Sequence, residues 1–214
     1  MARAEDIKTG LVRVAFVDNL YEPRAAEEGA TKKYGCTLLI PKSDTQTLKA
    51  LEKNIIDACV ADSWGDEAKI RDLISKEVIR VPVLDGDGKQ GVSKKTGERH
   101  PGYEGHFFVR VTSGENFPPQ VVDERVQKIA SHDATRLKSG DYGYAVVSAF
   151  TWDHPKTGKG VTFGIGAFQK VKDGEALGGS GGVDTGKFFS NEKVDAEDSP
   201  DETKTGAGAG GLFG

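Results

Sequence analysis

Residues 140–160, GDYGYAVVSAFTWDHPKTGKG, decide the fold, because two kinds of side chain alternate along one segment. Ala145, Val147 and Ala149 form a small apolar face, and this period of two is typical of a β-strand. The other face carries four rings, at Tyr142, Tyr144, Phe150 and Trp152. The segment predicts a strand, a turn and the start of a second strand, and it raises the question of what the ring-bearing face contacts.

The rest of the chain body also favours short strands. Apolar runs predict strands at residues 9–23, 34–41, 78–84, 106–114, 143–154 and 160–171. Pro82 cannot donate to a ladder, so the strand at 78–84 is expected near a sheet edge. Residues 118–123 and 126–131 predict a short hairpin, and glycines make residues 85–105 a long loop.

Two helices are expected between the second and third strands. Residues 43–65 carry apolar side chains at helical spacing, and Ser43 and Gln46 have the spacing of a capping box. Residues 66–77 predict a second, shorter helix. Short strands, glycine-rich turns and inserted helices fit a small β-barrel, and the OB fold is the commonest such barrel that binds nucleic acid. The sequence therefore predicts a mainly β, OB-like barrel with an inserted helical segment.

The C-terminal end of the chain has a different composition. Residues 175–214 are rich in Gly, Ser, Asp and Glu, and such a segment cannot bury enough apolar surface to offset the entropy of ordering. From Asp173 onward the net charge is −6, whereas residues 1–172 sum to +2. We expect an OB-like domain over residues 1–174 and a disordered acidic tail over residues 175–214. The charge split favours nucleic-acid binding or an interaction tail.

Composition also bounds the compartment. No run approaches the roughly 18 apolar residues of a membrane helix, and the N-terminus MARAEDIKTG lacks the apolar stretch of a secretory signal. Cys36 and Cys59 are the only cysteines and fall at apolar positions, so two buried reduced thiols are expected rather than a disulfide or a metal site. These features predict a cytoplasmic protein with no membrane segment.

The sequence lacks the motifs of the common catalytic sites. Its four histidines are scattered, and no HExxH, paired CxxC, GxxxxGK[ST] or GxSxG occurs. The loop that begins at Asp85, DGDGKQG, resembles a calcium loop, but Lys89, Gln90 and Thr96 replace residues that such a site requires. We therefore predict no enzyme activity, no cofactor and no metal, and an ordinary turn at Asp85.

The ring-bearing face suggests a binding function. If the small apolar face points into the barrel, the rings point outward, where they are costly unless they meet a partner. Single-stranded nucleic acid is such a partner, because stacking is worth about 1–3 kcal/mol per base and cations neutralise its phosphates. The neighbouring strand repeats the pattern. The candidate contacts outside the ring-bearing face are Phe108 and Arg110 on that strand, Arg13 on the first strand, Lys94, Lys95 and Arg99 in the long loop, and Lys156 and Lys159 in the last hairpin.

Two plainer alternatives stay open. In the first alternative, the ring-bearing face forms the barrel interior and the small residues pack under a helix, because large apolar residues are normally buried. In the second, the loop cations are an ordinary solvated surface. The interleaved Ser148 and the Tyr hydroxyls favour the exposed arrangement of the rings.

Several motifs occur in order over residues 9–180, and the most specific are LLIPKSD at 38–44 and KDGEALGG at 172–179. They resemble those of phage-encoded single-stranded DNA-binding proteins with an OB-type barrel. The resemblance implies coating of exposed strands during phage DNA replication or recombination, and an acidic tail that recruits replication proteins. It adds Tyr103, in GYEGHFF, as a base contact or a loop anchor. Such proteins often end in an aromatic residue, whereas this chain ends GAGAGGLFG, with Phe213 second from last.

We therefore expect a non-catalytic protein that binds single-stranded DNA with little sequence preference. The charge split further predicts that the tail competes with DNA for the basic surface. Two alternatives belong to other classes: a phage structural or assembly protein that binds proteins through the ring face, and a nuclease, for which Asp85 and Asp87 are the only close carboxylate pair on a loop. The sequence does not fix the oligomeric state, so a homo-oligomer stays open.

Overall fold

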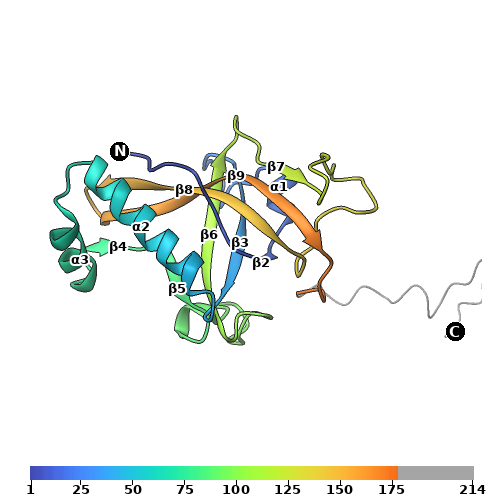
Figure 1. Ribbon diagram of the computed structural model, residues 1–214, viewed down its shortest axis with the longest axis horizontal. Helices are drawn as coiled ribbons and strands as arrows, with labels where there is room; N and C mark the ends of the chain where they lie inside the picture. The colour runs from blue at the N-terminus through green and yellow to red at the C-terminus, as the bar shows by residue number, and fades with distance from the viewer. Residues whose placement is uncertain (178–214) are drawn as a thin grey trace, which may run out of the picture. The chain divides into compact units, whose positions relative to one another are not determined.

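Five strands close into a barrel within residues 1–177, the part of the chain that this computed structural model describes (Figure 1). In barrel order they are β2 (Val12–Ala15), β3 (Lys33–Pro41), β6 (His106–Gly114), β9 (Gly158–Lys172) and β8 (Tyr142–His154), and β8 pairs back onto β2. Neighbouring strands are antiparallel except β6 and β9, which are parallel. This arrangement is a five-stranded OB-type barrel, which confirms the predicted fold.

The inner face of the barrel is apolar because alternate residues of each strand point into it. Ala145, Val147 and Ala149 of β8 are buried there, as the alternation in the sequence predicts. Helix α2 (Thr45–Ala61) packs against β8. The buried Asn54 side chain of α2 accepts a hydrogen bond from the Ala149 amide at 2.7 Å.

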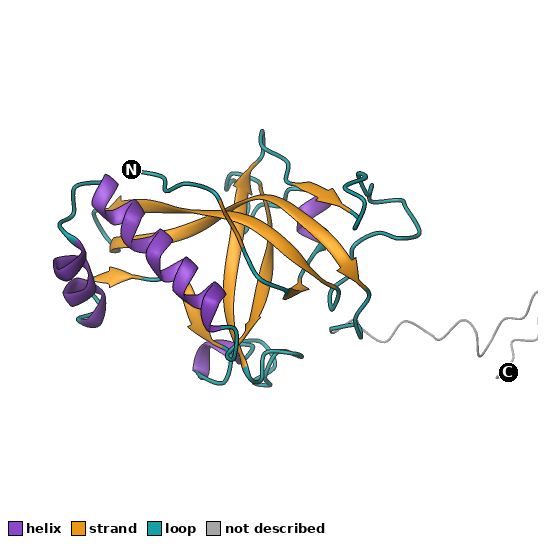
Figure 2. Ribbon diagram, in the orientation of Figure 1, coloured by secondary structure: helices purple, strands orange, loops and turns teal. Residues whose placement is uncertain are grey.

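Helix α2 lies alongside the barrel strands, and α3 (Glu67–Ser75) packs against α2 (Figures 1 and 2). The Asp44 carboxylate caps α2 by accepting a hydrogen bond from the Thr47 amide at 3.0 Å. The capping box predicted from Ser43 and Gln46 is therefore wrong, because the helix begins one residue later than that spacing requires.

Shorter elements lie at the margins of the barrel: β1 (Ile7–Lys8), α1 (Asp18–Tyr21), β4 (Ile79–Arg80), β5 (Val83–Asp85), the 3-10 turn η1 (Lys89–Gly91) and β7 (Gln120–Val122). The strand predicted at 78–84 is split at Pro82, so that β4 pairs with β9 and β5 with β6. The hairpin predicted at 118–131 forms through a Val122–Lys128 bridge, and β7 also pairs in parallel with β9. Within residues 1–177, no helix is both long enough and apolar enough to cross a membrane.

A second apolar cluster lies on the outside of the barrel, under loop 86–105. Its buried members are Ala15, Leu39, Tyr103 and Phe108, and Leu84 and Leu177 pack against them. The Leu177 amide also donates to the Ser139 carbonyl at 3.0 Å. The domain boundary at residue 174 stays a prediction, and the expected acidic tail beyond Leu177 lies outside the described residues.

Candidate nucleic-acid interface

The rings of β8 lie on the outer face of the barrel and are half-buried. Phe150 and Trp152 cover glycines of the neighbouring strand β9. A Cβ atom added to Gly164 would lie 2.5 Å from Phe150 Cε2, and one added to Gly160 would lie 2.3 Å from Trp152 Cζ2. Glycines therefore leave room for these two rings to rest on the backbone, as in sheets where a ring shields a strand glycine.

Cations from the N-terminal segment lie over three of these rings. The distance from cation to ring centroid is 5.4 Å for Arg3 over Phe150, 4.2 Å for Lys8 over Tyr144 and 5.4 Å for Arg13 over Tyr142. The cations of Arg3 and Lys8 reach these rings because β1 pairs with β8 and Arg3 forms an isolated bridge to Phe150. Sequence reasoning missed Arg3 and Lys8, because nothing local indicates that the N-terminal residues run beside β8.

A groove of about 670 Å³ crosses the outer face of β3 and β6 and is here called the outer groove. Gly35, Thr37, Arg110 and Thr112 lie on its floor, where β3 and β6 pair. Its walls come from the loop after β2, with Phe16, Asn19, Arg24, Ala25, Ala26, Ala30 and Thr31, and from loop 86–105, with His100 and Tyr103. Two additional cations that the sequence did not single out, Arg24 and Lys33, line it. A long, cationic and partly aromatic furrow of this kind suits an extended polyanion with flat bases.

Phe16 is the exposed ring of the outer groove. It is 54% exposed, and its φ of 58° places a non-glycine residue in the left-handed region. Its ring meets His100 edge-on at 5.6 Å between centroids, and His100 in turn packs on Tyr103 at 5.1 Å. Strained backbone of this kind concentrates at functional sites. The alternation in the sequence predicts Phe16 inside a strand, whereas β2 ends at Ala15 and the backbone turns at Phe16.

The outer groove continues toward the rings at the end of β8. A smaller hollow of about 180 Å³ is lined by Phe150 and Trp152, and it shares Lys33 and Thr112 with the outer groove. Thr112 of β6 is the register partner of Gly164 of β9, so the two hollows lie on adjacent strands of one surface. The structure thus brings Arg110, Phe150 and Trp152, all predicted contacts, onto one continuous surface.

Two predicted contact residues are buried: the expectation that Phe108 is exposed is wrong, and for Tyr103 the burial favours the alternative of a loop anchor. Phe108 is 0% and Tyr103 is 1% exposed, and their ring centroids lie 4.8 Å apart. The cause is loop 86–105, which folds back over the polar face of β6 and forms the second apolar cluster there. Neither ring offers a free face to a base, and Tyr103 serves as an anchor for the loop.

The predicted loop cations lie apart from this surface. Lys94, Lys95 and Lys156 are exposed, and none of the three lines the outer groove or the smaller hollow in the described part of the chain. Arg99 is engaged by its own loop, donating to the carbonyl oxygens of Gly86 and Asp87. Lys159 lies 3.5 Å from the Asp153 carboxylate and 5.0 Å from the Trp64 ring centroid.

The acidic pair of the long loop is bound to a lysine. Lys42 Nζ lies 2.7 Å from the Asp85 carboxylate and 2.8 Å from that of Asp87. The hydrogen bonds with Lys42 hold the pKa of both aspartates below the ordinary value and raise the pKa of Lys42. Among residues 1–177, no group of three or more His, Cys, Asp or Glu side chains is placed to hold a metal ion.

Comparison with known proteins gives a match over most of the chain. The profile of the family described as "Enterobacter phage Enc34, ssDNA-binding protein" matches residues 5–199. The chain belongs to the Enc34 single-stranded DNA-binding protein family. This membership confirms the resemblance that the sequence motifs indicated.

The relatives that match this chain align with it over most of their own length. "Putative protein p50" of Acyrthosiphon pisum secondary endosymbiont phage 1 is 29% identical over 184 residues, which cover 85% of this chain and 91% of that protein. The single-stranded DNA-binding protein of bacteriophage Enc34, solved in complex with ssDNA, has a TM-score of 0.56 at 22% identity, covering 81% of this chain and 89% of that one. Its C-terminal truncation has a TM-score of 0.54 at 23% identity, covering 80% and 88%. These two structures support the barrel fold.

Proposed function

We propose that this protein binds single-stranded DNA without catalysis, stacking bases on accessible aromatic rings and pairing phosphates with Lys and Arg. The observation that carries the proposal is the outer groove, which has Arg110 on its floor and the exposed Phe16 ring on its wall. It lies over β3 and β6, the second and third strands of the barrel, which is the face through which OB folds bind oligonucleotides. Membership of the Enc34 family supports the same class of ligand.

The chemistry of the outer groove determines how binding should behave. Arg24, Lys33 and Arg110 supply positive charge along it, and each neutralised phosphate releases counterions, so affinity falls as salt rises. Stacking on Phe16, Phe150 and Trp152 does not depend on base edges, so sequence preference is slight.

The biological role follows from this binding mode. The protein coats strands exposed during phage DNA replication or recombination, in the cytoplasm of the host cell, and needs no cofactor. The acidic C-terminal segment competes with DNA for the basic surface and recruits replication proteins. A chain ending at Gly178 is then expected to bind oligonucleotides more tightly than the full chain, and equal affinity of the two chains speaks against this role of the segment.

Fluorescence anisotropy with a labelled oligothymidine tests the proposal. Full-length protein is expected to bind the oligothymidine in preference to a duplex of equal length. Arg110→Gln is expected to weaken binding and to lower the salt slope by about one. Arg125→Gln is the matched control, because Arg125 is 82% exposed in side-chain area and lines neither the outer groove nor the smaller hollow. No binding, or equal effects of the two substitutions, would contradict the proposal.

The same labelled oligothymidine distinguishes the proposed function from the two rival functions. A structural or assembly protein binds neither oligonucleotide specifically. A nuclease cuts the labelled strand when Mg²⁺ is added, but its candidate carboxylates, Asp85 and Asp87, are already paired with Lys42. An intact oligonucleotide after prolonged incubation with Mg²⁺ is the expected result.

A further inference from the structure

One wall of the outer groove belongs to loop 86–105, which folds over the outside of the barrel. His100 and Tyr103 of this loop line the outer groove, and His100 packs between Phe16 and Tyr103. Tyr103 and Thr37 of the groove floor both line the outer groove. The width of the outer groove and the position of the Phe16 ring therefore depend on where this loop lies.

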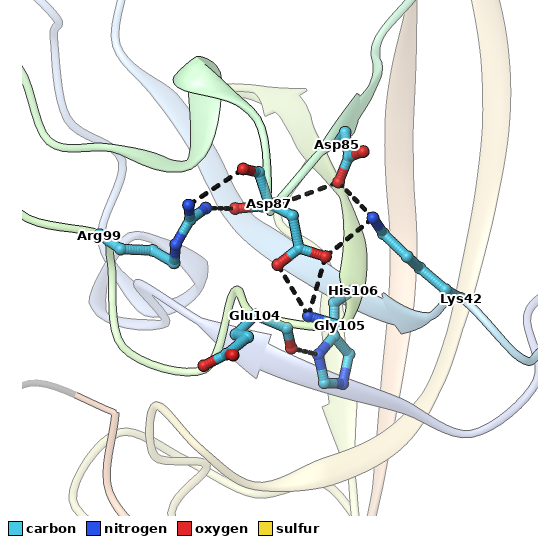
Figure 3. Close-up of polar contacts among 8 residues, drawn as sticks. Lys42, Asp85, Asp87, Arg99, Glu104, Gly105 and His106 are labelled. Atoms are coloured by element: carbon cyan, nitrogen blue, oxygen red, sulfur yellow. Dashed lines mark hydrogen bonds and ion pairs between the residues drawn. The ribbon is translucent and has the colours of Figure 1, made fainter.

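A cluster of three charged side chains closes the base of the loop (Figure 3). Lys42, directly after β3, reaches both the Asp85 and the Asp87 carboxylates, and we call these three residues the clasp. The Asp87 carboxylate also accepts a hydrogen bond from the Gly105 amide at 3.1 Å. The Asp85 carboxylate accepts one from the Asp87 amide at 2.8 Å. The clasp thus joins the first residues of the loop to its last residues and both to the end of β3.

Backbone contacts around the clasp fix the same geometry. The Lys42 amide donates to the Gly105 carbonyl at 3.1 Å. Arg99 donates to the carbonyls of Gly86 and Asp87 (Figure 3). A Cβ atom added to Gly91 would lie 2.0 Å from the Gly86 carbonyl oxygen. The backbone segments of the loop at Gly86 and Gly91 are therefore in direct contact. Asp87, at the start of the loop, contacts both Lys42, directly after β3, and Gly105, at the end of the loop.

We propose that Asp87 is a positioning residue for DNA binding, which holds loop 86–105, and with it His100 and Tyr103, in the place that the bound strand requires. The inference rests on the proposed function. The direction of the change in DNA affinity tests this role. A negative charge near a polyanion site opposes binding, so removal of the Asp87 charge alone should tighten binding. A positioning role predicts the opposite, because the wall of the outer groove loosens when the clasp is broken.

Substitution at two acidic positions of one loop separates charge from position. Asp87→Asn keeps the size of the side chain but removes the charge that Lys42 and Gly105 bind. Affinity for oligothymidine is expected to fall about threefold to tenfold, the equivalent of the net contribution of one ordinary hydrogen bond. The salt slope is expected to stay unchanged, because the cations that meet phosphates are the same.

Glu98→Gln is the matched control. It removes one negative charge from the same loop, and the Glu98 carboxylate has no hydrogen bond or ion pair within residues 1–177. Its affinity is expected to equal or slightly exceed that of the wild type. Asp87→Glu retains the charge and is expected to restore at least part of the affinity that Asp87→Asn loses.

Limited trypsin digestion reports the position of the loop without DNA. Lys94, Lys95 and Arg99 are cleavage sites inside loop 86–105. Asp87→Asn is expected to be cut there faster than the wild type, and Glu98→Gln at the wild-type rate. Because the clasp is solvent-exposed, the thermal midpoint of Asp87→Asn should change little. Asp85→Asn, which shares Lys42, is the second variant and should shift affinity in the same direction.

The outcomes distinguish this inference from the proposed function. Binding by Asp87→Asn that is as tight as binding by Glu98→Gln would overturn the positioning role, and so would unchanged cleavage of the loop. If the wild-type protein itself fails to bind oligothymidine, the proposed function fails, whatever the variants do.

Discussion

The Phe150 ring occupies the space that a side chain at Gly164 would fill. A Cβ atom at Gly164 would lie 2.5 Å from Phe150 Cε2, closer than such contacts occur in proteins. The glycine on β9 and the ring on β8 are therefore one structural unit, and the ring can lie at the smaller hollow only because the glycine has no side chain.

Gly164→Ala is expected to displace the Phe150 ring and to weaken binding of single-stranded DNA. Overpacking of this kind costs about 1–3 kcal/mol of stability. Gly166→Ala is the control, because it lies on the same strand and its Cβ would meet its nearest neighbour, the Val146 carbonyl oxygen, only at 4.0 Å. Anisotropy and thermal unfolding of both variants test this, and equal behaviour of the two would show that the ring and the glycine are not coupled.

Phe16→Gly is expected to separate binding from stability. Glycine accepts a φ of 58° without strain, so removing the Phe side chain relieves the backbone while it deletes the stacking ring. Affinity for oligothymidine should fall by the equivalent of about 1–3 kcal/mol, the value of one stacked base. Thermal stability should hold or rise. Phe117→Ala is the control, since Phe117 is 73% exposed and lies outside the outer groove. Unchanged binding by Phe16→Gly would remove Phe16 from the site.

Lys170→Met is expected to destabilise the barrel without touching the binding surface. Lys170 Nζ lies 2.9 Å from the carboxylate of Asp141, whose side chain is only 2% exposed. Loss of the lysine leaves that buried carboxylate without a counter-ion, bound only by the amides of Lys138 and Gly174, and this costs about 3–5 kcal/mol. Lys172→Met, on the same strand and exposed, should cost within about 0.5 kcal/mol. Chemical denaturation measures both, and a small effect at Lys170 would contradict the assigned role of this ion pair.

The clasp is expected to break at acid pH and to stay intact at neutral and mildly alkaline pH. Hydrogen bonds from Lys42 lower the pKa of Asp85 and Asp87, so their stabilising effect is present above the ordinary Asp pKa of about 3.9 and is lost as pH falls through the lowered values. The raised pKa of Lys42 keeps the lysine charged until strongly alkaline pH. The NMR signal of the Gly105 amide, which donates to Asp87, should therefore titrate with a midpoint below about 3.9. A midpoint at or above that value would show that Lys42 does not hold the pair.

The sequence predicted the barrel well because its signals are local. The alternation at Ala145, Val147 and Ala149 predicted both the long hairpin and the buried face of β8. It also predicted that Phe150 and Trp152 face outward, since the register of a strand fixes both faces at once.

The site was predicted less completely, because much of it depends on contacts between distant segments. Phe108 was expected on the surface, and only the fold of loop 86–105 buries it. Arg3 and Lys8 reach the rings of β8 through pairing across more than a hundred residues. Phe16 was hidden because a left-handed backbone at a non-glycine residue has no sequence signature.

Single-stranded DNA that follows the outer groove to the Phe150 and Trp152 rings is expected to change the surroundings of Trp152. Trp64 and Trp152 are the only tryptophans, so a Trp64→Phe protein reports on Trp152 alone. Titration of this protein with oligothymidine is expected to quench its fluorescence, and the quench should be smaller at raised salt. When the protein also carries Arg110→Gln, the binding curve should shift to higher oligothymidine concentration. Binding detected by anisotropy without any change in Trp152 emission would show that the bound DNA does not reach the Trp152 ring.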